Sequence, residues 1–372
     1  MVNISFTGDI LPNERMNNVL NGDYSKCFKR AGKLKNCDYL VGNLETPVAG
    51  EELRYTHERY CFNTPDGILD ALKETGFDML TLANNHCMDR GEEGILNTLE
   101  SCRRYGFDTI GLYASAEERN RVFVKETDGI KIAFINYTYG TNAFAHGRFL
   151  EHPYMVNLFQ PEETKKGSIH LLNDYKQIAE DVKRIYMEKS DEYEFAEPYL
   201  KQLESDIKKA KAEADYVIVI AHNGGQYVEK VDPYSIFIAE KIKEFGADII
   251  VGHHQHIIQA CDNTDDYLKI FCLGNFLYDN RICDGEDYFD KPSYNAVFHL
   301  GLSKNEQGKI ETKKAFSIYT TMTDKNGVPI IIDSSDLFAI KNETHLFSDI
   351  LHYANLFAGE EKYTNIQERY AL

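Results

Sequence analysis

The sequence predicts an α/β fold in which buried parallel strands alternate with helices. Five segments open with an aspartate, continue as a short apolar run and follow stretches with helical character. Runs of this length after helices are typical of buried parallel strands. Polar side chains directly follow four of the five runs, and open α/β sheets hold their ligands at the carboxyl ends of such strands. We therefore expect one edge of one sheet to carry the chemistry. The segments begin at Asp38, Asp78, Asp108, Asp215 and Asp248.

Turn and helix signals in the first part of the chain set most element boundaries. Pro65 suits the first position of a helix, and Gly76 ends that helix. Residues 91–105 carry the apolar stripe of another helix. Asp128-Gly129 predicts a hairpin turn. The expected elements are strands at 2–7, 38–41, 78–82 and 108–112, helices at 65–74 and 91–105, and hairpin strands at 122–124 and 131–137.

The second part begins with a stretch of different character, residues 144–212, which is irregular at first and then charged and helix-prone. We expect it to be a helical excursion from a domain that spans residues 1–334. Residues 335–372 then form a C-terminal helical tail. The remaining expected elements are strands at 215–220 and 248–251, a helix at 233–245, and strands of a second sheet at 257–260, 268–273, 295–302, 310–319 and 328–332.

Composition excludes several classes of function. With 372 residues and 43% apolar content, the chain can bury a large core. Its formal charge of -18 argues against nucleic-acid or anionic-membrane contact, because both need a basic face. Eight cysteines without a Cys-x-x-Cys pair predict reduced thiols. No signal peptide and no run of 18 apolar residues is evident, so we expect a cytoplasmic protein with no membrane segment.

A set of metal-ligand side chains follows the predicted strands. Carboxylate, amide oxygen and imidazole together suit zinc, manganese or iron, and the absence of thiolates disfavours a structural zinc knot. A carboxylate among imidazoles can bridge two ions, and such a pair clamps both oxygens of an in-line phosphoryl displacement. An imidazole beside the ligands can protonate the leaving oxygen. We assign that role to His86. The candidate ligands are Asp9, Glu45, Asn85, His222, His254 and His256.

Other polar residues near these motifs have ordinary structural explanations. His254 and His256 are two residues apart, so on an extended chain they project to one side and His253 is the expected bystander. Asn43 and Asn84 are more typical of turns. Isolated histidines at 57, 146, 152 and 170 are expected to be surface or hydrogen-bonded residues. Four arginines could clamp an anion but are more often solvated, namely Arg54, Arg59, Arg90 and Arg148.

Six motifs, in this order and at these intervals, resemble the CapA family of capsular poly-γ-glutamate synthesis, within the calcineurin-like metallophosphoesterases. The resemblance covers about residues 3–280 and implies a four-layer sandwich of two facing β-sheets flanked by helices. It also implies that Glu45 bridges two ions, one completed by Asn85, His222 and His254, the other by Asp9 and His256. The motifs are Gly8-Asp9, Gly42-Asn43-Leu44-Glu45, Leu82-Ala83-Asn84-Asn85-His86, His222-x-Gly224, Gly252-His253-His254-x-His256 and Leu273-Gly274-Asn275-Phe276.

The sequence departs from the family pattern at several positions. Leu11 replaces the second residue of the usual Asp-x-His, so the second ion loses a ligand. Gln226 replaces a usual acid, and Gln255 a usual proline. Members of the family are often exported or membrane-anchored. These departures leave the implied fold and metal site in place.

The resulting hypothesis is a hydrolase, most simply of phosphoesters, that uses one tightly and one weakly held divalent ion. Its partner would be a small anionic or polyglutamate-type substrate. One alternative is a capsule-assembly or polyglutamate-binding component that keeps the metal without turnover. Amide hydrolysis at the same site is another, because a divalent ion polarises carbonyl and phosphoryl oxygens alike.

Overall fold

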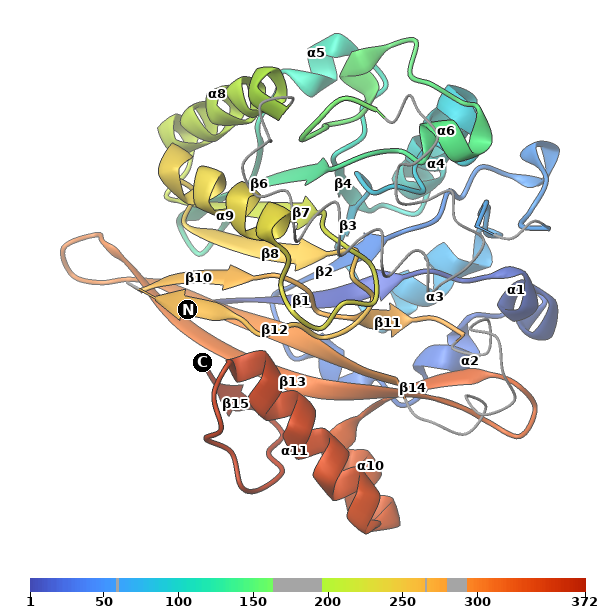
Figure 1. Cartoon of the computed structure of the whole chain (residues 1–372), viewed down its shortest axis with the longest axis vertical. Helices are drawn as coiled ribbons and strands as arrows, with labels where there is room; N and C mark the ends of the chain where they lie inside the picture. Colours follow the sequence, from blue (N-terminus) through green and yellow to red (C-terminus); the bar gives the residue numbers. More distant parts are fainter. Residues whose placement is uncertain (58–59, 163–195, 265, 280–292) are drawn as a thin grey trace.

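The computed structural model describes residues 1–57, 60–162, 196–264, 266–279 and 293–372. Within these ranges the strands form two mixed sheets that face one another, with helices on the outer sides (Figure 1). This arrangement confirms the predicted fold class. Arg59, His170 and residues 163–195 of the predicted excursion lie outside the described residues.

The larger sheet combines a parallel half with an antiparallel half. Its strand order is β14-β13-β12-β1-β2-β3-β4, with β11 beside β1 and β15 beside β13. The pairs β1–β2, β2–β3 and β3–β4 are parallel, whereas β12, β13 and β14 pair antiparallel. The bounds are β1 Val2–Ile10, β2 Tyr39–Leu44, β3 Met79–Thr81, β4 Asp108–Ile110, β11 Asn275–Leu277, β12 Ser293–Lys304, β13 Ile310–Thr323, β14 Pro329–Asp333 and β15 Tyr370–Ala371.

The smaller sheet has the order β5-β6-β7-β8-β10-β9. Its centre, β6-β7-β8-β10, is parallel, and its two edge strands are antiparallel. The predicted hairpin at Asp128-Gly129 is confirmed, because it joins β5 to β6. The bounds are β5 Phe123–Thr127, β6 Ile130–Thr138, β7 Tyr216–His222, β8 Ile249–His253, β9 Asp262–Thr264 and β10 Tyr267–Ile270.

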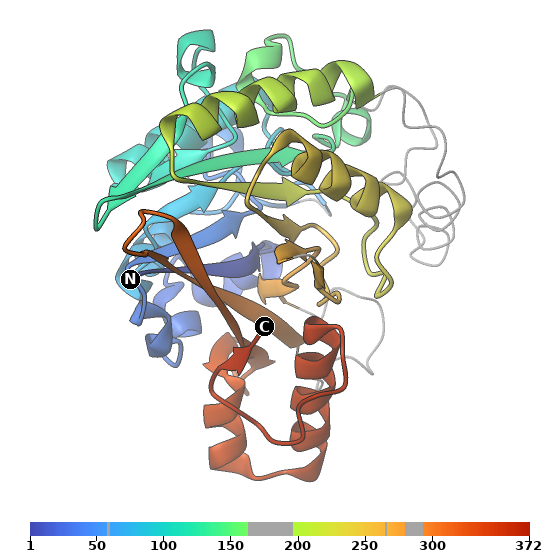
Figure 2. The same cartoon turned by 90° about the vertical axis from the view of Figure 1, so that its left-hand side faces the viewer.

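Helices cover both outer faces of this pair of sheets (Figure 2). α8 and α9 lie over the smaller sheet, and α1 to α4 pack beside the parallel half of the larger one. α10 and α11 lie at the antiparallel half, near the C-terminus. The bounds are α1 Glu14–Leu20, α2 Ser25–Phe28, α3 Gly67–Thr75, α4 Gly91–Arg104, α5 Ala116–Arg119, α6 Ala143–His146, α8 Glu197–Glu213, α9 Pro233–Phe245, α10 Ser334–Lys341 and α11 Thr344–Ala358, with short 3₁₀ turns at Gly32–Lys35, Glu51–Leu53 and Pro153–Met155.

The apolar layer between the sheets holds them face to face. Ile4, Phe6 and Val41 of the larger sheet belong to the same buried cluster as Ile218 and Ile249 of the smaller sheet. Burying apolar side chains releases roughly 25 cal/mol for each Å² removed from water, so this layer fixes the relative position of the sheets. The strand ends of both sheets therefore keep a fixed position relative to one another.

Three sequence predictions about the sheets were wrong. The five aspartate-led strands are divided between the sheets, β2, β3 and β4 in the larger and β7 and β8 in the smaller, so the chemistry is not at one edge of one sheet. Residues 257–260 form only an isolated bridge at Ile258. β10 and β12 belong to different sheets, because local patterns define strands but not their partners.

The C-terminal segment is helical through α10 and α11. β15 then returns to pair with β13, so the helical pattern ends before the chain does. Within the described residues, no helix has both the length and the apolar character needed to cross a bilayer.

Candidate metal centre

The candidate ligands lie at the carboxyl ends of strands from both sheets. β1 carries Asp9, the segment after β2 carries Glu45, and the turn after β3 carries Asn85. β7 ends at His222, and His254 and His256 directly follow β8. In Figure 1 the arrowheads of β1, β7 and β8 point to the same side of the molecule. Because the two sheets face one another, candidate ligands that are far apart in the sequence lie close together.

Close packing of the backbone fixes the position of Asp9. A Cβ atom at Gly8 would lie 1.9 Å from the carbonyl oxygen of Gly274, so only glycine fits there. The Asp9 backbone N–H donates to this carbonyl at 3.0 Å. The first strand and the segment before β11 are therefore locked together beside the carboxylate.

Three potential ligand atoms surround a single ring nitrogen of His222. Its Nε2 lies 2.8 Å from Asn85 Oδ1, 3.1 Å from His254 Nδ1 and 3.4 Å from Glu45 Oε1. One imidazole nitrogen carries at most one proton, so it can donate to only one of these atoms. The resemblance implies that Asn85, His222 and His254 hold one ion together with the bridging Glu45. The structure brings these four residues together. Their role as ligands stays a prediction.

The Glu45 carboxylate is buried without compensation. The side chain is fully buried, and neither oxygen has a hydrogen-bond partner within the described residues. Burial raises the pKa of Glu45 well above its usual range, and the neighbouring Asp9 and Asp89 carboxylates add to the effect. A buried carboxylate without donors is costly unless a cation compensates it.

The Asp9 carboxylate, in contrast, has several donors. Asn43 Nδ2 donates to Oδ1 at 2.7 Å, and the His254 backbone N–H donates to Oδ2 at 3.3 Å. Ring nitrogens of His253 and His256 each lie 3.2 Å from one of its oxygens. Burial alone would raise the pKa of Asp9, but these two histidines hold it well below its usual range.

His256 joins Asp9 to Glu45. Its Nδ1 faces Asp9, and its Nε2 lies 3.8 Å from Glu45 Oε1. Potential ligand atoms of Asp9, Glu45 and His222, and likewise of Glu45, His254 and His256, lie within 4.8 Å of one another. These two groups share Glu45 and could hold metal ions.

The extended-chain argument about the histidine cluster was wrong. His254 and His256 have φ values of 103° and 62°, in the left-handed region that non-glycine residues rarely adopt. The chain therefore turns after β8, and His253 faces Asp9 instead of projecting away. Burial lowers the pKa of His222 well below its usual range, so this ring is neutral, the form that binds metals.

His86 lies beside this cluster. Its Nδ1 is 2.8 Å from Asp89 Oδ2, and the edge of the Phe62 ring packs against the imidazole with 4.6 Å between centroids. Asn142 lies within hydrogen-bond distance of both His86 and Asn85. His86 is 4% exposed and belongs to neither metal-ligand group.

Sequence reasoning missed three residues of the centre. Asn43 contacts both Asp9 and His222, at 2.7 and 3.4 Å, although a turn role was favoured. Asn275 Oδ1 lies 2.9 Å from His256 Nδ1. Asp89 comes three residues after His86, a spacing that could have indicated the pair.

Arg90 is buried, and its guanidinium contacts carbonyl groups of Arg54, Cys61 and Asp89. It is therefore not the solvated residue that was expected.

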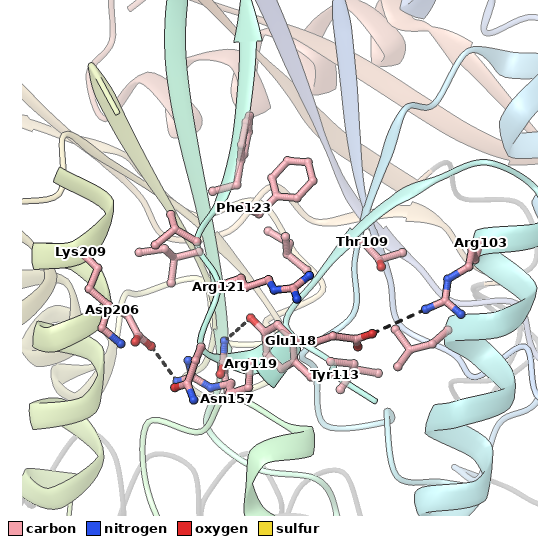
Figure 3. A pocket seen from close by; sticks show the side chains of 17 residues that line it. Arg103, Thr109, Tyr113, Glu118, Arg119, Arg121, Phe123, Asn157, Asp206 and Lys209 are labelled. Carbon is pink, nitrogen blue, oxygen red and sulfur yellow. Dashed lines mark hydrogen bonds and ion pairs between the residues drawn. The ribbon is translucent and has the colours of Figure 1, made fainter. Parts of the chain in front are cut away.

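A cavity of about 320 Å³ lies apart from these ligands, between α4, α5, α8 and the edges of the two sheets (Figure 3). Its polar lining is formed by ion pairs. Arg119 Nη2 lies 2.7 Å from Asp206 Oδ2, and Arg103 Nη2 lies 4.0 Å from Glu118 Oε1. None of the predicted site residues lines this cavity.

The chain is similar to bacterial capsule proteins. "Capsule biosynthesis protein CapA" of Bacillus anthracis is 27% identical over 283 residues, which is 74% of this chain and 59% of that protein. "PGA biosynthesis protein CapA" of Bacillus subtilis (strain 168) is 24% identical over 276 residues, 74% of this chain and 60% of that protein. The chain thus spans about three fifths of the length of these relatives.

One solved structure is also similar, that of a hypothetical protein from Thermus thermophilus. It has 15% sequence identity and a TM-score of 0.43, over 86% of this chain and 98% of that one. The family model "Bacterial capsule synthesis protein PGA_cap" matches residues 3–280. The chain therefore belongs to the family of bacterial capsule synthesis proteins of the PGA_cap type, as the motifs in its sequence had suggested.

Proposed function

We propose that this protein is a metal-dependent hydrolase, most simply of phosphoesters. The observation that carries the proposal is the convergence of Glu45, Asn85 and His254 on one ring nitrogen of His222. Together with the uncompensated Glu45 carboxylate, this convergence is the donor set that a borderline divalent ion such as zinc, manganese or iron prefers.

The ligands divide into a stronger and a weaker set. Glu45, Asn85, His222 and His254 would hold one ion, and Asp9 and His256 would hold a second, weaker one through shared Glu45. The second set is weaker because Asp9 already accepts hydrogen bonds and because Leu11 supplies no ligand. Bound divalent ions supply Lewis acidity, which polarises a phosphoryl oxygen and activates water.

His86 would act as the catalytic imidazole. Asp89 contacts its Nδ1, which fixes the ring orientation and leaves Nε2 as the nitrogen that serves the substrate. Phe62 packs against the ring and limits its rotation. A proton on His86 would be transferred to the leaving oxygen, a step that typically contributes about 10²- to 10⁴-fold to the rate.

The test is turnover of phosphoesters by purified protein loaded with Mn²⁺ or Zn²⁺. Generic and nucleotide phosphoesters serve as substrates, and γ-glutamyl peptides test amide hydrolysis. We expect His86→Ala to lose about 10²-fold or more in kcat with metal content unchanged. His345→Ala is the matched control, since this histidine is exposed. Activity that survives His86→Ala would remove the catalytic role of His86.

The second candidate is a metal-holding capsule or polyglutamate component without turnover. Family membership and the names of the relatives favour it, as does the amide of Gln226, which lies 3.3 Å from His256 in place of an acid. It predicts binding of γ-glutamyl oligomers without cleavage. Isothermal titration with such oligomers, combined with product analysis, separates the two candidates.

A further inference from the structure

A second group of metal-ligand side chains lies next to His86 and shares no predicted ligand with the candidate metal centre, although Asp89 also contacts His86. Cys61, Asp89 and His146 bring a sulfur, a carboxylate oxygen and a ring nitrogen within 4.8 Å of one another. Cys61 and Asp89 are buried, and the His146 side chain is 10% exposed. Three separate segments supply these residues: the chain before α3, the turn after β3 and the end of α6.

Two of the three ligand atoms lack hydrogen bonds. Asp89 Oδ1 and His146 Nε2 are buried and have no hydrogen-bond partner within the described residues, although they lie only 3.2 Å apart. Two ligands on one tetrahedral ion, with bonds of about 2.0–2.1 Å, lie roughly 3.3 Å from each other. The spacing of these atoms is therefore the one that a shared tetrahedral ion requires.

Two arginines and one carbonyl group lie near the Cys61 sulfur. Arg90 Nη1 lies 2.6 Å and Arg148 Nη1 3.8 Å from Sγ, and Sγ lies 3.3 Å from the Asp89 carbonyl oxygen. A metal ion binds cysteine in the thiolate form. A thiolate and the Asp89 carboxylate carry two negative charges, of which Arg90 compensates one at close range.

We propose that Cys61, Asp89 and His146 bind a thiophilic divalent cation of the zinc type, at a site separate from the candidate metal centre. The other Asp89 oxygen, Oδ2, lies 2.8 Å from His86 Nδ1 and accepts from the Phe62 backbone N–H at 2.6 Å. An ion on Oδ1 therefore fixes the carboxylate that orients His86.

A proton on His146 competes with this ion. Burial alone would lower the pKa of His146, but Asp89 and the Cys61 sulfur raise it to about 10. A protonated ring balances the same negative charges without a metal. If a metal ion binds here, the Cys61 sulfur is one of its ligands. In a metal-free ion network the sulfur binds no metal, and spectroscopy of the metal–sulfur bond distinguishes the two cases.

Cobalt substitution tests the proposal, because Co²⁺–thiolate coordination absorbs in the near ultraviolet and the candidate metal centre contains no sulfur ligand. The metal-free protein is titrated with Co²⁺. We expect a thiolate charge-transfer band, its loss in Cys61→Ser, and about one ion fewer per chain in that variant by elemental analysis. His146→Gln should weaken the same band and serves if Cys61→Ser does not fold.

Two controls keep this result separate from the proposed function. Cys37→Ser removes a more accessible thiol and should leave the band intact. His222→Gln should also leave it intact while removing an ion from the candidate metal centre. Absence of the band from wild-type protein, or its persistence in both Cys61→Ser and His146→Gln, overturns the proposal in favour of a metal-free ion network.

Discussion

The candidate metal centre and the cavity of Figure 3 both place charged side chains inside the fold, but they differ in how the charges are paired. In the cavity, each lining arginine has an acidic partner. Arg119 donates to Asp206 and to the Tyr137 hydroxyl, and that hydroxyl donates to Asp206 at 2.6 Å. Glu45, in contrast, is fully buried and has no donor within the described residues. Asp206 of the cavity thus has a cationic partner, whereas the Glu45 carboxylate of the centre has no hydrogen-bond partner within the described residues.

This difference teaches how to distinguish a structural polar cluster from a ligand site. Buried polar groups are almost always hydrogen-bonded, so an exception requires an explanation. At the centre, three potential ligand atoms face one ring nitrogen of His222, which can donate to only one of them, and the Glu45 carboxylate has no hydrogen-bond partner within the described residues. We infer that the missing partner is a cation.

The largest effect is expected from Glu45→Gln. Binding of Zn²⁺ or Mn²⁺ should weaken by more than about 100-fold, since even residues that only support ligands contribute 10- to 100-fold. Metal-free Glu45→Gln should unfold at a higher temperature than metal-free wild type, because the raised pKa of the buried Glu45 carboxyl group costs folding free energy at neutral pH. Titration calorimetry and thermal unfolding measure both. Equal metal affinity in the two proteins would remove the distinction between centre and cavity.

Arg119→Met should act in the opposite way. It leaves the buried Asp206 without its cationic partner, which costs about 3–5 kcal/mol of folding free energy, and it should leave metal content unchanged. Both side chains are nearly buried, with 12% and 11% exposure. Urea unfolding together with elemental analysis tests the prediction. A loss of metal without loss of stability would contradict it.

His299 provides a pH-dependent version of the comparison. Its two ring nitrogens lie 2.8 Å from Ser5 Oγ and 3.1 Å from Ser317 Oγ, so both nitrogens of this partly buried imidazole have protein hydrogen-bond partners. Burial lowers its pKa to about 3, and the Arg369 charge adds to the effect.

The sign of this effect follows from proton uptake. Between pH 6.5 and 3 the unfolded histidine binds a proton and the folded one does not, so stability falls as pH falls through this window. From pH 7 to pH 5 the loss is about 2 kcal/mol. His299→Gln should remove that part of the pH dependence, as measured by urea unfolding at both pH values. An unchanged slope would show that His299 is protonated in the folded state.

The smallest effect is expected at Arg121, which lines the same cavity as Arg119 but is 70% exposed. Its ion pair with Glu117 is solvated, and such pairs contribute less than about 1 kcal/mol. Arg121→Ala should therefore change the urea midpoint far less than Arg119→Met. A comparable loss in both variants would show that exposure does not govern these pairs.

Much of the fold could be predicted because local patterns define the elements. The aspartate-led runs gave β2, β3, β4, β7 and β8, and Asp128-Gly129 gave the hairpin. The division of these strands between two sheets could not be predicted, because an apolar run has the same pattern in either sheet. The long β12–β13 pairing joins the larger sheet through contacts far apart in sequence.

The candidate ligands were predictable because each follows a strand end. The contacts among them were not, since His254 and His256 adopt left-handed backbone that alternation cannot anticipate. Asp89, Cys61 and His146 were missed as a group because they come from separate segments of the chain. Only the tertiary fold places them together.

Anomalous diffraction from a crystal grown with Mn²⁺ or Zn²⁺ tests the central claim most directly. We predict a peak in contact with the Glu45 carboxylate and His222 Nε2, absent from crystals of Glu45→Gln. A map without that peak, with Glu45 protonated and hydrogen-bonded to His222, would contradict the claim.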